Sequence, residues 1–366
     1  MRIGFHSPLP PARTGVADHA ASLLTALRTF GTVELAPARA DVHLYHIGNN
    51  TLHRGIYARA LAEPGVVVLH DALLQHLFMG SLDEAGYLDE FVFNYGEWSR
   101  DLARELWRGK ASSGLRPAYY RYPMLKRLAE RSLAVIVHNP AAARIVRAHA
   151  PHTPVIEIPL LYADSPIPSP AESLRLRQQL CRAPFLFGVF GYLRESKRVT
   201  VALRAFQRVR AARPNSAFLL AGEIVSPDLD RALDPLLRQP GVIRLGHLPQ
   251  GEFLRVAAAA DACVNLRYPS AGETSAIAIR LMGLGKPVIV SSGEETSRYP
   301  GDACLRVDAG SAEEEMLTHY MLSLRHLPGL GGEIGRRAVE HIRRWHSVER
   351  VARLYWETLC AHRQRG

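Results

Sequence analysis

Residues 268–290 read YPSAGETSAIAIRLMGLGKPVIV and combine a strand end, a polar loop, a helix of small residues and a buried strand. The loop 272–275 brings a carboxylate and two hydroxyls to the amino end of that helix, where backbone N–H groups favour an anion. This combination suits a polyol that carries a phosphate, because Glu273 can hold two hydroxyls while the amides meet the phosphate. The alternative is purely structural, with Ser270 or Thr274 as the N-cap and Glu273 complementing the helix dipole.

Buried strands of the same kind recur along the chain and divide into two sets. Each is a short apolar or β-branched run followed by a helical pattern, which is typical of a parallel sheet covered on both faces. Two such sets predict an α/β fold with two doubly wound, Rossmann-like domains. The first set is 2–5, 32–35, 42–47, 66–70, 135–138 and 155–158, and the second is 185–191, 217–222, 242–246, 262–267, 287–291 and 304–307.

The segment 159–170, PLLYADSPIPSP, is the predicted linker between these domains. Its four prolines fix φ and remove backbone donors, which disfavours both helix and central strand. The length of 366 residues agrees with two or three domains of roughly 150 residues each. We therefore place the first domain at 1–165 and the second at 171–346.

Charge and cysteine content narrow the class of protein. There are 45 Lys and Arg against 35 Asp and Glu, and this net charge of +10 favours anionic partners such as phosphates or an acidic membrane surface. The cations are dispersed and no nucleic-acid-reading motif is present, so we expect no nucleic-acid partner. The 4 cysteines share no close spacing, which excludes CxxC zinc sites and a disulfide framework. Without a signal sequence or a long apolar run, a cytoplasmic protein is expected.

Residues 100–131 hold nine Arg and Lys against three acidic residues. Trp107, Tyr119, Tyr120 and Tyr122 lie in the same segment, and one interpretation places them at a lipid interface. That interpretation predicts a peripheral contact with the inner face of a membrane. The other interpretation is a solvated helical face whose arginine stems cover core aromatics.

Polar residues follow the strands of the first set, where ligands of open α/β sheets bind. His70 and Asp71 end the stretch VVVLHD, so His70 can hydrogen-bond a substrate hydroxyl and Asp71 can orient it or accept a proton. Otherwise His70 is a core residue and Asp71 caps the next helix. Asn139 takes the equivalent place after 135–138. Gly15 opens the first helix, either as an anion-binding amide or as a simple turn.

The turn 191–198, GYLRESKR, follows the first strand of the second set. Arg194, Lys197 and Arg198 place three cations at one strand-to-helix turn, which can clamp a diphosphate. The alternative is a solvated basic turn. Lys197 stands out because the chain has only four lysines among its basic residues.

Together these motifs resemble glycosyltransferase family 4, the retaining enzymes of the GT-B fold. The family's loop carries a pair of glutamates, then small residues and a Gly-x-Pro-Val strand, and residues 268–290 share with it the first glutamate, the small residues and the strand. The resemblance covers most of the chain and implies two Rossmann-like domains facing a cleft, with a C-terminal helix at 347–366 packing back on the first domain. Its other carriers are Thr14-Gly15, His70, the turn 191–197, Gly222-Glu223, AAAADA at 257–262 and HSVERVARLYWETL at 346–359.

The resemblance also implies roles for the candidate residues. Glu273 holds the sugar of a nucleotide-diphosphate sugar, and His70 hydrogen-bonds it near the reacting carbon. Arg194 and Lys197 neutralise the diphosphate, so neither a cofactor nor a metal is required. The remaining donor-site residues are Gly15, Gly191, Gly272, Thr274, Ser275 and Arg280, with Asp71 and Asn139 on the acceptor side.

Two positions depart from the family pattern. Counted back from Gly285, the place of the second glutamate holds Arg280, and the spacing to Glu273 is one residue shorter. In the family that glutamate touches the nucleotide ribose, so recognition of the ribose differs here. Tyr192 stands where many relatives place a phosphate-binding arginine, and Arg194 supplies a cation two residues later.

The function implied is retaining transfer of a sugar to a hydroxyl of a glycan, a lipid-linked glycan or a small glycoside. Two alternatives stay open. One is a GT-B epimerase or hydrolase of nucleotide sugars. The other is a catalytically silent GT-B subunit that binds a partner, which the Arg280 departure keeps in view.

Overall fold

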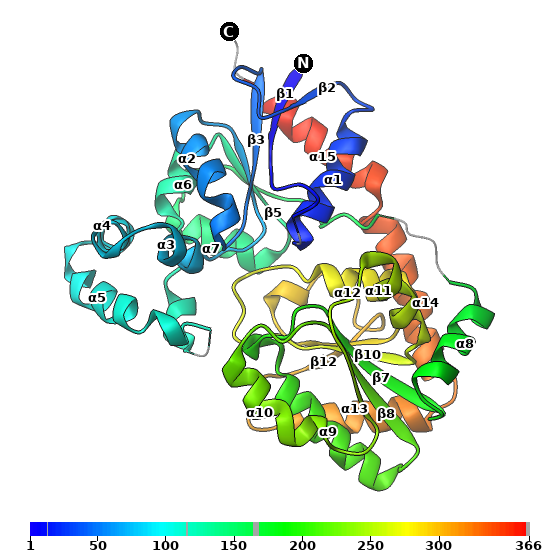
Figure 1. The fold of residues 1–366 in the computed structure, drawn as a ribbon. Coiled ribbons are helices and arrows are strands. Elements are labelled where there is room, and N and C mark those ends of the chain that lie inside the picture. Colours follow the sequence, from blue (N-terminus) through cyan, green and yellow to red (C-terminus); the bar gives the residue numbers. More distant parts are fainter. Residues whose placement is uncertain (13, 115, 164–167, 364–366) are drawn as a thin grey trace. The chain divides into compact units, whose positions relative to one another are not determined.

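The computed structural model describes residues 1–12, 14–114, 116–163 and 168–363. They form two compact units, coloured along the chain in Figure 1. The first unit contains Met1–Ala163, Pro269–Thr274 and Trp345–Gly366, and the second contains Asp164–Tyr268 and Ser275–Arg344. The loop Pro269–Thr274 thus clusters with the first unit, although its place in the sequence is between elements of the second.

A six-stranded parallel sheet forms the centre of the first unit, in the order β2-β1-β3-β4-β5-β6. Its strands are β1 (Arg2–His6), β2 (Thr32–Leu35), β3 (Val42–Ile47), β4 (Val66–Leu69), β5 (Ala134–Val137) and β6 (Val155–Glu157). Its helices are α1 (Gly15–Leu27), α2 (Arg54–Ala62), α3 (Gln75–Ser81), α4 (Glu84–Tyr95), α5 (Arg100–Arg108), α6 (Lys126–Arg131), α7 (Pro140–His149) and α15 (Val348–Ala361), with 3-10 turns η1 (Thr51–His53), η2 (Glu97–Ser99), η3 (Lys110–Ser112) and η4 (Pro117–Arg121).

Alternate side chains along these strands face two different layers of core. Leu44 and Val68 belong to the layer covered by α1 and α15, which lie side by side in Figure 1. Tyr45 and Leu69, each one residue further along, belong to the layer covered by α2 to α7. Because both faces are covered, β3, β4 and β5 are buried at every position, which explains the continuous apolar sequence of β4 and β5.

The second unit repeats this architecture with a parallel sheet in the order β12-β11-β10-β7-β8-β9. Its strands are β7 (Phe185–Phe190), β8 (Ser216–Ala221), β9 (Val242–Leu245), β10 (Ala262–Asn265), β11 (Val288–Ser291) and β12 (Leu305–Val307). Its helices are α8 (Pro170–Leu180), α9 (Val199–Ala212), α10 (Pro227–Leu237), α11 (Gln250–Ala259), α12 (Ala276–Gly283), α13 (Glu313–His326) and α14 (Leu330–Trp345), with η5 (Glu195–Lys197) and η6 (Glu294–Thr296).

The predicted α/β class and the two parallel sheets are confirmed, and each predicted strand corresponds to one of these twelve. The linker proposed at 159–170 lies partly outside the described residues, which omit 164–167. From Trp345 onward the chain belongs to the first unit, where the Nδ1 of His346 pairs with the carbonyl oxygen of Leu160 at 2.7 Å. Among the described residues, no helix combines the length and apolar character needed to span a membrane.

Candidate functional site

His70 and Asp71 lie at the carboxyl end of β4. The backbone N–H of His70 donates to the carbonyl oxygen of Ile47 at the end of β3, 2.9 Å away, and the ring is partly exposed. Asp71 accepts a 2.9 Å hydrogen bond from the backbone N–H of Asn49. The alternative that Asp71 caps the next helix is wrong, because α3 begins after Leu74 and no side chain caps it.

Gly15 begins α1 at the same edge of the sheet, in the connection that follows the end of β1. Thr14 caps this helix, its hydroxyl accepting a 3.1 Å bond from the N–H of Ala17. Gly15 is exposed, and a Cβ added there would meet no atom within 4 Å. A larger residue would therefore cause no steric clash at this position. The amino end of α1 is exposed and accessible to an anion.

Three further imidazoles surround His70. The Nδ1 of His46 lies 2.9 Å from the Nε2 of His70, and the rings of His19 and His138 lie 5.2 Å from the His70 ring, centroid to centroid. Burial lowers the pKa of both His46 and His70 well below the ordinary value, and neighbouring imidazoles lower it further. These side chains are therefore neutral near pH 7.

The loop Pro269–Thr274 is fastened to the first unit beside His70. Ala72 donates its backbone N–H to the carbonyl oxygen of Ala271 at 2.8 Å. The side-chain amide of Asn139 donates to the carbonyl oxygen of Gly272 and to the hydroxyl of Thr274, both at 2.9 Å. Gly272 has φ +72°, and a Cβ there would lie 2.8 Å from the Cβ of Ala72, so the close approach requires glycine.

All the polar atoms of the Asn139 side chain are engaged within the protein. Its oxygen accepts the N–H of Ala142 at 2.9 Å, which makes it the N-cap of α7, and its amide holds the loop. The predicted place of Asn139 at a strand end is confirmed. Its contacts are those of a residue that positions Gly272 and Thr274.

Glu273 projects from this loop and is partly exposed. Its carboxylate accepts a 2.7 Å hydrogen bond from the backbone N–H of Ala271. Ser270 accepts the N–H of Gly272 at 3.0 Å, and Ser275 caps α12 by accepting the N–H of Ala278 at 3.2 Å. The expectation that Ser270 or Thr274 caps the helix is wrong, because each hydroxyl is used to fold the loop.

Lys197 is the central cation of the turn in the second unit. It lies in η5, is only 5% exposed, and its ammonium donates to the carbonyl oxygen of Phe190 at the end of β7. Burial lowers the pKa of Lys197 well below the ordinary lysine value, and the positive charges of Arg267 and Arg194 act in the same direction. An anion bound next to this ammonium would stabilise its positive charge, which burial otherwise makes unfavourable.

Glycines allow the backbone to pass close to this ammonium. Gly191 has φ +80°, and a Cβ there would stand 3.1 Å from the Lys197 nitrogen. Gly222 has φ +155°, and a Cβ there would stand 2.1 Å from the carbonyl oxygen of Gly191. The ends of β7 and β8 therefore lie close together next to Lys197. Glycines of this kind are common where backbone approaches a ligand closely.

The three cations predicted at this turn differ in their contacts. Arg194 is exposed at the start of η5. Arg198 instead binds Glu313, with its Nε 2.9 Å from a carboxylate oxygen, and Glu313 is 1% exposed. This ion pair already engages the Arg198 guanidinium, and leaving Glu313 buried without its partner would be costly.

The two positions that depart from the family pattern also lie in the second unit. Arg280 is partly exposed on α12. Tyr192 follows Gly191, and its ring stacks on that of His247 with centroids 6.1 Å apart. A stacked ring with a phenolic hydroxyl differs from the cation that many relatives of the resembled family carry there.

The aromatics of residues 100–131 pack inward. Tyr119 is fully buried, and Trp107, Tyr120 and Tyr122 are partly buried against the same core. The interpretation that places these four rings at a lipid interface is wrong, and their packing is that of core aromatics. Several arginines of the segment form ion pairs, namely Arg100 with Glu97 and Asp89, Arg104 with Asp101, Arg116 with Glu105 and Arg127 with Glu90.

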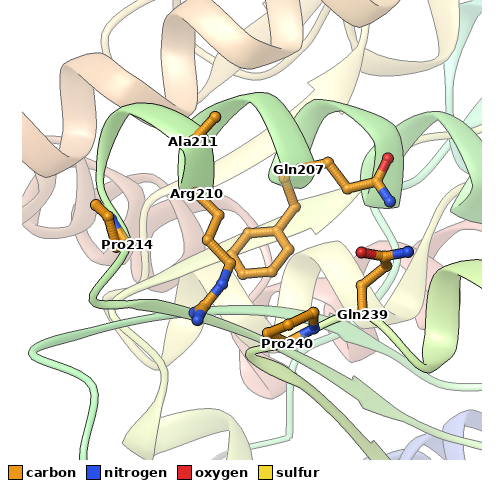
Figure 2. Close-up of a pocket in the computed structure, with 7 residues that line it drawn as sticks. Gln207, Arg210, Ala211, Pro214, Gln239 and Pro240 are labelled. Carbon is orange, nitrogen blue, oxygen red and sulfur yellow. The ribbon is translucent and has the colours of Figure 1, made fainter.

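A surface hollow of about 310 Å³ lies elsewhere in the second unit (Figure 2). Phe206 and Arg210 of α9 line it together with Pro240. Arg210 donates to the carbonyl oxygen of Ser216, which begins β8, so the hollow lies at the amino ends of the strands. Ligand sites of open α/β sheets lie at the opposite ends, where Gly191 and Lys197 are found.

Sequence reasoning missed the polar residues behind His70. His46 and His19 reach it from β3 and α1, and Asn49 binds both Asp71 and the N–H of His76 at 2.8 Å. The only signal is the pair of histidines inside the otherwise apolar strand VHLYHI. Nothing in the order of the residues shows that α1 brings a further imidazole to the same point.

The structure thus gathers the candidates into two sets. The first unit brings together His70 and Asp71 at the end of β4 and the loop of Gly272, Glu273 and Thr274, with Asn139 fastening the loop. Gly15, at the start of α1, also belongs to the first unit. All the remaining candidates lie in the second unit. Those of the second unit are Gly191, Arg194, Lys197, Ser275 and Arg280.

Comparisons with known proteins agree with this architecture. Sucrose-phosphate synthase from Thermosynechococcus elongatus is 15% identical, with a TM-score of 0.66 over 99% of this chain and 100% of that chain. HepE from Anabaena, solved with UDP and glucose, is 16% identical, with a TM-score of 0.65 over 99% of this chain and 100% of that chain. WaaG, a glycosyltransferase involved in lipopolysaccharide biosynthesis, is 14% identical, with a TM-score of 0.63 over 97% of this chain and 99% of that chain.

The TM-scores over nearly the whole of each chain support a shared fold. No curated protein sequence matches the chain. Residues 184–324, which include the turn of Gly191 and Lys197 and all of the stretch first quoted, match the family model described as glycosyl transferases group 1. The chain therefore has the GT-B fold of two parallel-sheet units, and its residues 184–324 match the model of the glycosyl transferases group 1.

Proposed function

We propose that this protein is a retaining, metal-independent glycosyltransferase of the family 4 type. It moves a sugar from a nucleotide-diphosphate sugar to a hydroxyl of a glycan, a lipid-linked glycan or a small glycoside. The observation that carries the proposal is the buried ammonium of Lys197 beneath the Gly191 turn, within the matched region 184–324. HepE was solved with UDP-glucose, which makes UDP-sugars the first donors to test.

In the proposed reaction, Lys197 and Arg194 stabilise the charge that develops on the diphosphate. The bond from the anomeric carbon to the diphosphate oxygen breaks, and its electron pair stays on that oxygen. The acceptor hydroxyl oxygen bonds to the same face of the carbon and passes its proton to the leaving phosphate. Fixed cations and backbone amides stabilise this separation of charge without a protein nucleophile.

The other candidates bind and orient the donor. Glu273 holds sugar hydroxyls through its carboxylate, supported by Gly272, Thr274 and Ser275. His70 donates to or accepts from the sugar near the reacting carbon. Gly15 and Gly191 offer backbone amides to phosphate oxygens. Arg280, in the place of a family glutamate, contacts the nucleotide.

The acceptor is assigned to the first domain at 1–165, with the helix 347–366, and the donor to the second domain at 171–346. Asp71 orients the acceptor hydroxyl, and Asn139 acts through the loop it holds. We also assign a cytoplasmic location with a peripheral contact at an anionic membrane face. The excess of cations in residues 100–131 supports this contact, as does Trp98, which precedes them and is 73% exposed.

A thermal-shift screen against UDP-, GDP-, ADP- and TDP-sugars tests donor binding first. We expect a saturable shift with one nucleotide class. Transfer is then measured with Lys197→Met and Glu273→Ala, and both should abolish it while circular dichroism stays that of the folded protein. Lys286→Met is the matched control, since Lys286 is partly buried and donates to the carbonyl oxygens of Ala258 and Ala260.

The outcomes separate the alternatives. Brisk turnover of a donor without any acceptor would indicate an epimerase or a hydrolase. A folded protein with no saturable binding of any nucleotide sugar would indicate a silent subunit. Wild-type transfer in both Lys197→Met and Glu273→Ala would overturn the proposal.

A further inference from the structure

Four buried or half-buried histidines meet at one point of the first unit, and three of them form a compact ligand set. One ring nitrogen each from His19, His46 and His70 lies within 4.8 Å of the other two. His138 packs beside them, its ring 5.6 Å from that of His19. We propose that His19, His46 and His70 bind one divalent transition-metal ion of the zinc type.

The strand pattern explains why the histidines converge. Positions 42, 44 and 46 of β3 share one face of the sheet, as do 66, 68 and 70 at β4 and 134, 136 and 138 at β5. The first two members of each row are apolar and pack beneath α1 and α15. The third member of each row is a histidine, at the ends of three neighbouring strands. His19 enters from the buried side of α1, between Ala17 and Leu23.

Two ring nitrogens of the cluster, one on His46 and one on His138, make no hydrogen bond among the described residues. His138 pairs its Nδ1 with the carbonyl oxygen of Ile158 at 2.9 Å, which makes this nitrogen the donor and leaves Nε2 with its lone pair. That Nε2 is buried and has no hydrogen-bond partner among the described residues, and the same holds for the Nε2 of His46, a residue that is 0% exposed. Buried polar atoms without partners are rare and point to a bound ion or water.

The donor set selects the kind of metal. Three neutral imidazoles suit Zn²⁺, Co²⁺, Ni²⁺ or Cu²⁺, whereas Mg²⁺ and Ca²⁺ prefer carboxylate and carbonyl oxygens. Three histidine ligands leave a fourth position of a tetrahedral ion open to water. The partly exposed ring of His70 provides the route by which an ion and its water reach the cluster.

Metal binding has a consequence for the reaction, and this part rests on the proposed function. The Nε2 of His70 already faces His46, so an ion bound there fixes the ring and withdraws it from the sugar. We therefore expect Zn²⁺ to inhibit sugar transfer and a chelator to restore it. The site is then an inhibitory one, which is compatible with chemistry that needs no metal.

Binding is tested without any sugar. The protein is purified without a polyhistidine tag, treated with EDTA, dialysed and titrated with Co²⁺, while bound Zn²⁺ is counted by elemental analysis. We expect one ion per chain and the visible absorption bands of tetrahedral Co²⁺. His46→Gln should weaken binding by roughly 100-fold or more, since even loss of a supporting residue costs up to this much.

His43→Gln is the matched control, because His43 lies on the same strand but faces the other side and pairs with His6 at 2.9 Å. It should bind one ion as the wild type does. His19→Gln provides a second test if His46→Gln does not fold. Absence of stoichiometric binding by the wild type, or wild-type affinity in folded His46→Gln or His19→Gln, would overturn the metal site. Binding without any sugar transfer would support the site and overturn the proposed function instead.

Discussion

The side-chain amide of Asn139 donates a 2.9 Å hydrogen bond to the backbone carbonyl oxygen of Gly272, across a sequence separation of 133 residues. The same amide reaches the hydroxyl of Thr274. One buried side chain therefore sets the position of the loop that carries Glu273. The hydrogen bond from the backbone N–H of Ala72 to the carbonyl oxygen of Ala271 is a second contact that holds this loop.

Asn139→Asp tests the hydrogen bonds to the loop, here called the Asn139 clamp, separately from the capping of α7. An aspartate keeps the oxygen that accepts the N–H of Ala142, so the cap survives. It loses both donated bonds and places a carboxylate against the carbonyl oxygen of Gly272. We expect the free energy of unfolding of the first unit, measured by urea titration, to fall by about 2 kcal/mol, and transfer to fall with it.

Asn50→Asp is the control for that experiment. Asn50 caps η1 by accepting the N–H of Leu52 at 3.0 Å, and the same substitution there should change stability by no more than about 0.5 kcal/mol. Equal effects at Asn139 and Asn50 would contradict the clamp.

Gly222→Ala tests the close approach of β7 and β8 above Lys197. A Cβ at Gly222 would lie 2.1 Å from the carbonyl oxygen of Gly191, and φ +155° is unfavourable for alanine. We expect a loss of about 3 kcal/mol of stability from backbone strain and displacement, together with weaker donor binding in the thermal-shift assay. Gly246→Ala, where a Cβ meets nothing within 4 Å, should behave as the wild type. A fully stable Gly222→Ala would show that the two strand ends can separate freely.

Much of this fold could be predicted from sequence because local pattern determines it. Strands such as 66–69 are continuous apolar runs, and a run of that kind is stable only when both faces are covered. The positions of His70 at the end of one strand and of Lys197 in the turn that follows another are predicted by the same pattern. Burial of Lys197 is not, because it depends on how β7 and β8 meet.

The remaining features depend on partners distant in sequence. Arg198 is one residue from Lys197 and looks equivalent in the sequence, yet its guanidinium pairs with the buried carboxylate of Glu313. Thr274 precedes α12 as a cap would, yet Asn139 uses its hydroxyl and Ser275 becomes the cap. Secondary-structure propensity is a property of one segment at a time. The roles of Arg198 and Thr274 depend instead on contacts with residues of other segments.

Vesicle sedimentation tests the membrane contact. Each Lys or Arg near an anionic surface contributes about 1 kcal/mol, so a larger fraction of protein should sediment with anionic than with neutral vesicles, and added salt should reverse it. Trp98→Ala should lower the sedimented fraction, because this exposed ring lies directly before residues 100–131. Trp345→Ala, at a tryptophan that is 37% exposed elsewhere in the chain, is the control. Equal sedimentation with both kinds of vesicle would remove the proposed contact.

The stability of the first unit should fall in acid because of His6. The pKa of His6 is lowered from 6.5 to about 4, mainly by burial and secondly by the neighbouring His43. Between these two values the unfolded chain binds a proton that the folded protein does not, so the free energy of unfolding decreases as the pH falls. The contribution is fully present above pH 6.5 and is lost by about pH 4. The shift corresponds to about 3 kcal/mol.

His6→Gln removes this one titration and leaves the other buried histidines in place. Urea unfolding at several pH values should therefore show a smaller loss of stability between pH 7 and pH 4 in His6→Gln than in the wild type, by up to about 3 kcal/mol. His152→Gln, an exposed histidine, should follow the wild-type curve. Parallel curves for His6→Gln and the wild type would mean that His6 takes up its proton equally readily in both states, and that its contact with His43 costs nothing when charged.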